Sequence, residues 1–274
     1  MPAIRLVLSG GSAKGLLECC GALSAVIERG NTIEIGAGNS AGGVVLGAFA
    51  SGRGPKEIKD ILLSTDFTKF ISTSFLSKLR LAFSGNLSDG KKYLKFCEEV
   101  TRGKTFKDAG FDLRIMGSDY SFGRPAIFAK QTHQAMPLAL AMRITSAIPL
   151  GFSAVGYDNR WFKDGGLYAH VPVSAARDPL KTVIFAIATD PANPKKEEWS
   201  EDVGIAREVG RAIDLLVDAN VKSELDNAPE GAIKVFSDSL GFSTFKFDFS
   251  KAEKERLFVH GYELMESALK LAGL

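Results

Sequence analysis

The sequence predicts an α/β protein in which helices cover both faces of a mostly parallel central sheet, a three-layer α/β/α arrangement. Short apolar runs at residues 4–8 and 33–38 have the length and composition of buried strands. Each run is followed by a segment with apolar residues at helical spacing, at 16–29 and 40–51. This strand–helix–strand–helix order is typical of parallel strands joined by crossover helices.

The rest of the chain continues this alternation. Further strands are expected at residues 112–118, 126–129 and 183–189. Further helices are expected at residues 56–63, 90–101, 137–145, 201–220 and 251–271. Because no internal repeat or linker interrupts the sequence, we expect one domain over residues 1–274, with a motif-bearing core at about 4–190 and a helical part at about 200–274.

The composition excludes several classes of protein. Of 274 residues, 45% are hydrophobic and 24% are charged, which permits one large core without disulfides or metals. The 34 basic and 32 acidic residues nearly balance, which argues against nucleic-acid binding. Cys19, Cys20 and Cys97 lack the spacing of a bridge or a metal site, so we expect small buried side chains in a reducing compartment. No metal and no cofactor are expected.

The sequence also bears on membranes. The first apolar run is too short for a signal peptide and leads directly into a glycine turn, and no stretch of about 18 apolar residues follows. We therefore expect a cytoplasmic protein, with export by a signal-independent route left open. Residues 67–83 mix apolar and basic side chains, which fits either an interfacial lid on anionic lipid or a core-packing segment with a solvated basic edge.

The segment Gly38-Asn39-Ser40-Ala41-Gly42 has the G-x-S-x-G pattern between an apolar strand and an apolar helix. This context is typical of a nucleophile elbow, in which a sharp turn exposes the serine hydroxyl. Glycines at 38 and 42 are needed because a Cβ would clash in so tight a turn. The helix N-terminus favours the negative charge that forms during acyl transfer, so Ser40 is the predicted nucleophile.

A competing interpretation exists for the same glycines. Residues 36–41 also fit G-x-G-x-x-G/A, a dinucleotide-binding fingerprint. That fingerprint requires an acidic residue about 20 positions further on, at the tip of a second strand. Glu57 and Asp60 are at that distance but fall in a predicted helix, which favours the elbow.

A second glycine-rich turn, at residues 9–15, lies between the first strand and the first helix. It is not a P-loop, because the Gly-Lys-Ser/Thr ending is missing. Such a turn presents backbone N–H groups to an anion, and beside an elbow serine the anion would be the tetrahedral oxyanion. The predicted oxyanion hole comprises Gly10, Gly11, Ser12 and Ala13.

A third feature, Asp164-Gly165-Gly166, would by itself be taken as a surface turn. In this order, however, the glycine-rich loop, the elbow and the Asp-Gly-Gly resemble the motifs of the patatin-like phospholipase family. Residues 143–149 are similar to the family's Arg-Ala-Ser-x-Ala-x-Pro, and residues 87–90 and 105–106 also resemble family segments. The resemblance covers about residues 4–190.

The resemblance implies a patatin-like fold and a Ser–Asp dyad without histidine. Ser40 would attack a carboxylic ester and Asp164 would act as base, which requires that Asp164 be desolvated. The implied activity is that of a lipid acyl hydrolase of the phospholipase A or lysophospholipase type, acting on lipid or phospholipid with peripheral membrane contact. Some relatives need a protein activator. Ser12 replaces the family's third glycine, and a positive φ there would cost about 1 kcal/mol.

Two alternatives remain open. Ser40, Asp164 and His260 have the chain order of an α/β-hydrolase-type esterase triad. Only one strand precedes the elbow, however, and His260 falls in a predicted amphipathic helix. His133 and His170 are expected to be structural. The other alternative is a weakly active or inactive lipid-binding or partner-binding module, for which Ser12 is the only indication.

Overall fold

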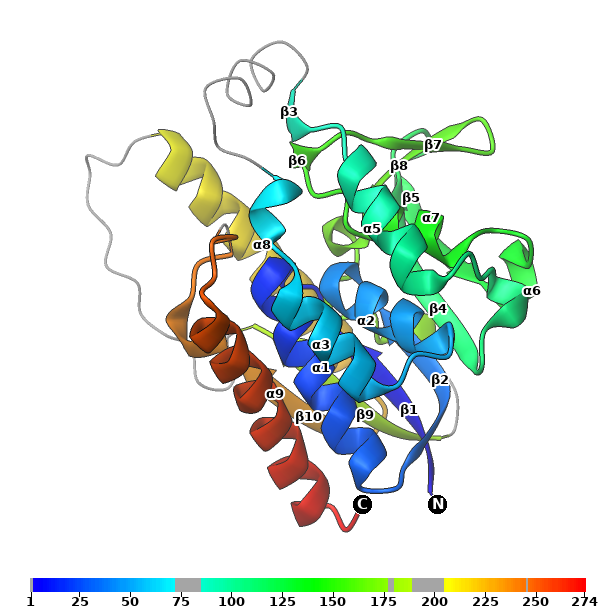
Figure 1. Cartoon of the computed structure of the whole chain (residues 1–274), viewed down its shortest axis with the longest axis vertical. Coiled ribbons are helices and arrows are strands. Elements are labelled where there is room, and N and C mark those ends of the chain that lie inside the picture. The colour runs from blue at the N-terminus through cyan, green and yellow to red at the C-terminus, as the bar shows by residue number, and fades with distance from the viewer. Residues whose placement is uncertain (1, 72–84, 177–179, 189–204, 245) are drawn as a thin grey trace.

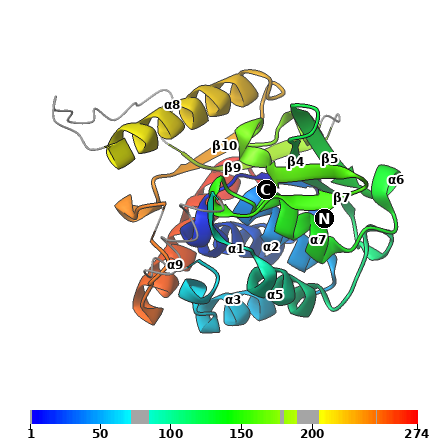
Figure 2. The same cartoon turned by 90° about the horizontal axis from the view of Figure 1, so that it is seen from above.

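A central sheet lies between two helical layers in the computed structural model, which describes residues 2–71, 85–176, 180–188, 205–244 and 246–274 (Figure 1). The α/β/α class predicted from the sequence is confirmed. Viewed from above, α8 lies on one side of the sheet, and α1, α2, α3, α5 and α9 lie on the other (Figure 2). The parallel strands Ala3–Leu8, Asp112–Asp119 and Lys181–Ile187 are accordingly buried over most of their length, as their apolar sequences predict.

The main sheet of the described chain has eight strands in the order β10-β9-β1-β2-β4-β8-β7, with β5 paired to β4. Its strands are β1 (Ala3–Leu8), β2 (Thr32–Gly38), β4 (Asp112–Asp119), β5 (Arg124–Ala129), β7 (Val155–Tyr157), β8 (Arg160–Asp164), β9 (Lys181–Ile187) and β10 (Ile233–Ser237). The pairs from β10 to β4 are parallel, whereas β5, β7 and β8 pair antiparallel with their neighbours. The short strands β3 (Asn86–Ser88) and β6 (Leu150–Phe152) form a separate pair.

The helices account for most of the covering layers. They are α1 (Ser12–Glu28), α2 (Ser40–Ala50), α3 (Pro55–Ser64), α5 (Lys91–Thr101), α6 (Lys130–His133), α7 (Leu138–Thr145), α8 (Ile205–Asp226) and α9 (Lys251–Leu271). The 3-10 turns are η1 (Phe67–Lys69), η2 (Phe106–Asp108), η3 (Gly165–Leu167), η4 (Ser174–Ala176) and η5 (Ser239–Gly241). None of the helices within the described residues combines the length and the apolar composition that a membrane span requires.

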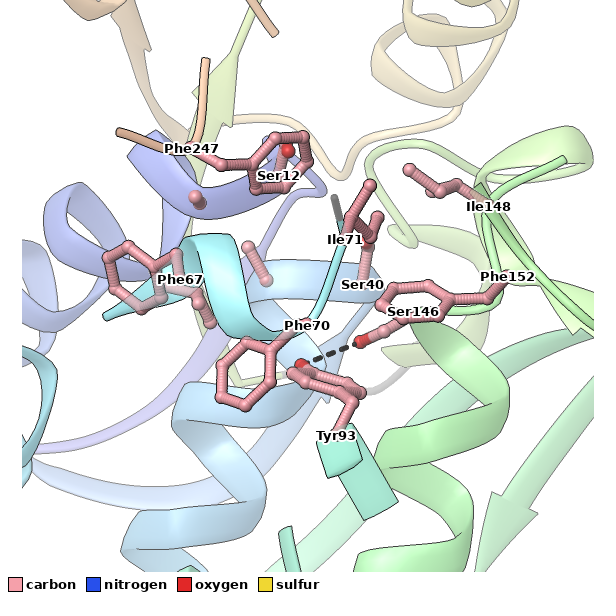
Figure 3. Close-up of a pocket in the computed structure, with 13 residues that line it drawn as sticks. Ser12, Ser40, Phe67, Phe70, Ile71, Tyr93, Ser146, Ile148, Phe152 and Phe247 are labelled. Carbon is pink, nitrogen blue, oxygen red and sulfur yellow. Dashed lines mark hydrogen bonds between the residues drawn. The ribbon is translucent and has the colours of Figure 1, made fainter. Parts of the chain in front are cut away.

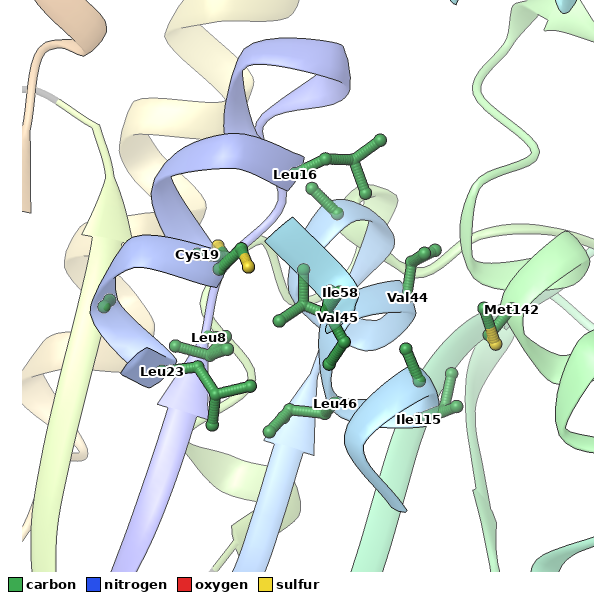
Figure 4. Close-up of a cluster of buried hydrophobic side chains, with 14 of the residues drawn as sticks. Leu8, Leu16, Cys19, Leu23, Val44, Val45, Leu46, Ile58, Ile115 and Met142 are labelled. Atoms are coloured by element: carbon green, nitrogen blue, oxygen red, sulfur yellow. The ribbon is translucent and has the colours of Figure 1, made fainter. Parts of the chain in front are cut away.

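The core follows the two-residue alternation of the strands. On β1, Leu6 and Leu8 join the large cluster under α1 and α2, whereas Val7 joins a smaller cluster that includes Val221 of α8. Figure 4 shows side chains of α1, α2, α3 and α7 meeting above the strands in the large cluster. Leu257 of α9 belongs to the same cluster, so the C-terminal helix is part of this core. The three cysteines are buried and free, as predicted.

Most predicted elements lie within a few residues of the observed ones, and the differences have physical reasons. The segments β7, β8 and β10 were not predicted, because strands of three to five residues are too short to establish an alternating pattern. The predicted helix at 201–220 is observed from Ile205 to Asp226, and residues 201–204 lie outside the described chain. The predicted strand at 183–189 is observed as Lys181–Ile187, with residue 189 undescribed.

The 67–83 segment is only partly described. Its first residues form η1, and the side chain of Phe67 is buried. Residues 72–83 lie outside the described chain, so the lid hypothesis for them is not addressed by the structure.

Candidate active site

The sheet register brings the two glycine-rich turns together. Leu8, the last residue of β1, pairs with Gly38, the last residue of β2, so the turns that follow are neighbours. The N–H of Asn39 donates to the Leu8 carbonyl at 3.2 Å, and the N–H of Gly42 donates to the Ser9 carbonyl at 3.0 Å. The proposed oxyanion loop and the nucleophile elbow are therefore hydrogen bonded to each other.

The same register brings Asp164 to this edge of the sheet. Gly38 pairs with Ile115 of β4, and Asp164, the last residue of β8, pairs with Gly117 of that strand. Although β8 runs antiparallel to β4, it pairs only with the last residues of that strand, Gly117–Asp119, so Asp164 lies just beyond the carboxyl end of β2. The Asp-Gly-Gly segment is thus not a surface turn, and the Asp164 side chain is buried.

The elbow at Ser40 has the strained geometry of a sharp strand-to-helix turn. Ser40 has a φ of 47°, in the left-handed region. A Cβ at Gly42 would lie 2.3 Å from the Leu8 carbonyl oxygen, and one at Gly38 would lie 2.6 Å from the Gly43 nitrogen. Only glycine fits at these two positions. The turn that they permit places Ser40 at the first position of α2.

The loop of residues 10–13 offers donors at the start of α1. Among the hydrogen bonds of the described residues, none uses the N–H of Gly11, Ser12 or Ala13. The N–H of Gly10 instead donates to the His170 carbonyl at 3.0 Å, so Gly10 anchors the loop and is not free to bind an oxyanion. Ser12 has a φ of 58°, so the residue that replaces the family glycine is strained by about 1 kcal/mol.

The Asp164 carboxylate is buried and only partly hydrogen bonded. The N–H of Gly166 donates to Oδ1 at 2.8 Å, whereas the buried Oδ2 has no hydrogen-bond partner among the described residues. Burial raises the pKa of Asp164 to about 6, and the Gly166 N–H and the nearby Ser40 and Asn39 side chains moderate the increase. A carboxylate of this kind is ionised at neutral pH and is a stronger base than an exposed aspartate.

An apolar cavity of about 50 Å³ adjoins the serine. Its lining residues are Ser12, Ala13, Leu16, Ser40, Ala41, Phe67, Phe70, Ile71, Tyr93, Ser146, Ile148, Phe152 and Phe247. The labelled side chains converge from several elements, and the dashed line marks the hydrogen bond of 3.1 Å between the Tyr93 and Ser146 hydroxyls (Figure 3). The cavity thus places Ser40, Ser12 and Ala13 beside an apolar surface.

The sequence motifs do not account for the whole lining. Tyr93 comes from α5, and Phe247 comes from the C-terminal part, where no family motif was identified. Aromatic residues repeat between Phe242 and Phe249, which was the only local signal in that part of the sequence. Such a repeat has no fixed sequence spacing to the three motifs, so its approach to the cavity beside Ser40 could not be inferred from the sequence.

The three histidines lie in other environments. His260 Nδ1 is 2.9 Å from Oε1 of Glu18, between α9 and α1. His170 Nε2 is 3.2 Å from the Ile187 carbonyl, and His133 Nδ1 is 2.7 Å from the Thr132 hydroxyl. In the described chain no histidine is hydrogen bonded to Ser40 or Asp164, so the geometry does not favour the Ser40–Asp164–His260 alternative. No group of three or more His, Cys, Asp or Glu side chains in the described chain could hold a metal ion.

Comparison with known proteins gives the family. The family model described as "Patatin-like phospholipase" matches residues 6–177. This match covers more than half of the chain and includes all three motifs. The chain therefore belongs to the patatin-like phospholipase family.

Individual relatives are more distant. The chain is 28% identical over 181 residues to "Probable lipid hydrolase 463L" of Invertebrate iridescent virus 6, a match that covers 62% of each protein. It therefore spans less than two thirds of that relative. VipD from Legionella pneumophila has a TM-score of 0.61 at 15% identity, covering 98% of this chain and 67% of VipD.

A second solved structure supports the same fold. The complex of full-length SpcU with full-length ExoU from Pseudomonas aeruginosa gives a TM-score of 0.53 at 19% identity. The match covers 98% of this chain and 52% of the matched chain. At these identities VipD and ExoU establish the fold, which confirms the patatin-like architecture predicted from the motifs.

Proposed function

We propose that this protein is a lipid acyl hydrolase of the phospholipase A or lysophospholipase type, with Ser40 as nucleophile and Asp164 as base. One observation carries the proposal. Ser40, with its strained backbone, lines an apolar cavity together with Ser12 and Ala13 at the start of α1, and the buried Asp164 carboxylate, whose Oδ2 has no hydrogen-bond partner among the described residues, interacts with the Ser40 side chain. This arrangement supplies a nucleophile, a base and oxyanion donors without histidine.

The reaction would take place in two stages. Ser40 Oγ attacks the ester carbonyl while its proton passes to Asp164 Oδ2, and the oxyanion accepts hydrogen bonds from Gly11, Ser12 and Ala13. Collapse breaks the ester C–O bond, and the departing alcohol takes the proton from Asp164. A water molecule then attacks the acyl-enzyme while one of its protons passes to Asp164. Collapse breaks the bond between Ser40 Oγ and the acyl group, Asp164 returns the proton to Ser40 Oγ, and the fatty acid is released.

The apolar cavity supports an acyl chain as the group held next to Ser40. Its aromatic and aliphatic lining would bury methylene groups at about 0.8 kcal/mol each. The viral relative, described as a probable lipid hydrolase, points to the same substrate class. A hydrolase of lipids must also contact a membrane or micelle surface, so we include peripheral membrane contact in the proposal.

The test is release of fatty acid from phospholipid vesicles and from lysophospholipid micelles. We would compare the wild type with Ser40→Ala, Asp164→Asn and His260→Ala. Ser51→Ala is the matched control, because Ser51 is a buried serine at the other end of α2, bonded to the Ala48 carbonyl. We expect the first two variants to lose about 100-fold to 10,000-fold in kcat, and the last two to remain close to the wild type.

Each other outcome has a definite meaning. Turnover by Ser40→Ala would exclude the nucleophile, and loss of activity in a folded His260→Ala would favour the triad. If the wild type binds vesicles without hydrolysing either lipid, the binding-module alternative gains support. ExoU was solved in complex with SpcU, so a protein partner would be tested before that conclusion.

A further inference from the structure

Two buried polar side chains lie between Ser40 and Asp164, and the mechanism above does not use them. Thr145 is the last residue of α7, and Asn39 immediately precedes Ser40. Both are fully buried. Thr145 Oγ1 accepts the Ser40 N–H at 2.8 Å and donates its own proton to Asn39 Oδ1 at 3.3 Å.

The bond from Ser40 to Thr145 replaces one that the helix cannot make. The first N–H groups of a helix have no partner within it, and a buried N–H without an acceptor is costly. Thr145 supplies that acceptor and thereby fixes the nucleophile's backbone in its left-handed conformation. The Ser40 N–H is consequently not available to an oxyanion.

The same short segment also holds the base. The N–H of Asp164 donates to the Ala147 carbonyl at 3.1 Å, two residues after Thr145. A segment of three residues therefore binds the backbones of both members of the proposed dyad. A shift of this segment would move the nucleophile and the base together.

The Asn39 amide lies next to the carboxylate. Its Oδ1 is taken by Thr145, whereas its buried Nδ2 has no hydrogen-bond partner in the described chain. Asn39 Nδ2 and Asp164 Oδ1 lie 3.0 Å and 3.1 Å from one point, the position that a Cβ on Gly166 would occupy. Both groups therefore border the same small space, and the Asn39 side chain lowers the pKa of Asp164, because an amide donor near a carboxylate favours its ionised form.

We infer that Thr145 and Asn39 are positioning residues for the dyad. Thr145 fixes the Ser40 backbone and orients the Asn39 amide, and Asn39 presents its NH₂ group to the Asp164 carboxylate. Nucleophile and base are thus connected by side chains of α7 and the elbow. This role presupposes the Ser40–Asp164 dyad proposed above.

The test compares Thr145→Val with Thr145→Ser. Valine keeps the shape of threonine and removes the hydroxyl, whereas serine keeps the hydroxyl. Thr101→Val is the matched control, because Thr101 is also fully buried and its hydroxyl donates to the Cys97 carbonyl within α5, outside the site. We expect Thr145→Val to lower kcat by about 10-fold to 100-fold with little change in KM, and Thr145→Ser to recover most of that loss. Thr101→Val should leave kcat unchanged.

Asn39→Ala gives a second measurement, which also decides the question if Thr145→Val does not fold. Removing the amide should move the acidic limb of the kcat/KM profile to higher pH and lower kcat. Loss of stability alone would not move that limb. An unmoved limb would overturn the role of Asn39.

Three results would overturn the role of Thr145: an unchanged kcat in Thr145→Val, an equal loss in Thr101→Val, or a change confined to KM. Ser40→Ala separates this inference from the proposed function. If Ser40→Ala is inactive and Thr145→Val has normal kinetics, only the positioning role fails. If Ser40→Ala retains full turnover, the proposed function has failed first.

Discussion

Two buried carboxylates, Glu18 and Asp164, have opposite surroundings. Oε1 of Glu18 accepts the Ser237 hydroxyl at 2.6 Å and lies 2.9 Å from His260 Nδ1, and Oε2 accepts the Ser239 hydroxyl at 2.6 Å. Both Glu18 oxygens are therefore satisfied. Asp164 Oδ2, in contrast, has no partner among the described residues.

This difference distinguishes a carboxylate that stabilises the fold from one that can take part in a reaction. A buried carboxylate with all its acceptor sites occupied stabilises the elements that supply the donors, here α9 and the segment after β10. A buried carboxylate with an open oxygen retains the capacity to accept a proton from a substrate or nucleophile. Burial alone does not identify a base, and neither does the presence of a nearby histidine and serine.

The strongest way to break this comparison is the pair of isosteric substitutions Asp164→Asn and Glu18→Gln. We expect Asp164→Asn to lower kcat by about 100-fold to 10,000-fold because the base is lost. The Glu18→Gln enzyme should keep its kcat. Steady-state kinetics on the folded proteins tests both, and an equal loss in the two variants would contradict the distinction.

The free energy of unfolding should respond in the reverse order, with the larger loss in Glu18→Gln. Glu18→Gln exchanges an acceptor of three hydrogen bonds for an amide that cannot satisfy them all, and should cost about 1–3 kcal/mol in urea unfolding. The pKa of His260 is raised, chiefly by its hydrogen bond to Glu18. That stabilisation is present below the unfolded pKa and is lost as pH rises through the folded pKa. The variant's deficit should therefore shrink toward alkaline pH, and a constant deficit would argue against the His260 contribution.

The contribution of Asp164 to the pH dependence of stability has the opposite sign to that of an ion-paired aspartate. Burial raises its pKa from 3.8 to about 6, so the folded state binds more protons than the unfolded state between these values. Stability contributed by the protonated carboxyl is lost as pH rises through this window. Asp164→Asn should therefore be about 1–3 kcal/mol more stable than the wild type at about pH 8, with the advantage disappearing near pH 4. Urea unfolding at both pH values checks this, and a variant less stable at alkaline pH would contradict it.

The pH dependence of the reaction sharpens the comparison. Because the base must be ionised, kcat/KM should rise with pH through a pKa of about 6 in the wild type. The same limb should persist in Glu18→Gln and in His260→Ala. If the acidic limb of the kcat/KM profile moved in either variant, the titrating group would belong to the Glu18–His260 contact between α1 and α9, contrary to our account.

The smallest expected effect concerns two serines with strained backbones, one at the start of α1 and one hydrogen bonded to Glu18. Ser12 and Ser239 have φ values of 58° and 54°. Ser12→Gly should relieve strain and stabilise the protein by up to about 1 kcal/mol, whereas Ser12→Ala should not. Ser239→Gly loses its hydrogen bond to Glu18 and should destabilise by about 1 kcal/mol despite the same relief. Thermal unfolding distinguishes these outcomes.

Much of the site could be predicted because its motifs are local. The glycines around Ser40 and the order of the three motifs are visible without knowledge of distant contacts. What the sequence lacks is the pairing of distant groups. The binding of Gly10 to His170, of His260 to Glu18, and the approach of Phe247 to the cavity all depend on tertiary packing.

The strand that ends in Asp164 was not predicted either. β8 reads Arg-Trp-Phe-Lys-Asp and pairs antiparallel beside β4, so it has neither the length nor the apolar continuity of the parallel strands. The Asp164 position and its desolvation were therefore expected from the family motif alone, and the sheet register shows how the burial arises.

The central claim is that Ser40 is activated by Asp164 without a histidine. The most direct measurement is covalent labelling with an alkyl fluorophosphonate, followed by mass spectrometry of the peptides. Our account predicts one phosphonyl adduct, on Ser40, formed at the wild-type rate in His260→Ala and Ser51→Ala and about 100-fold or more slowly in Asp164→Asn. An adduct on another residue, or equal slowing in His260→Ala and Asp164→Asn, would contradict it.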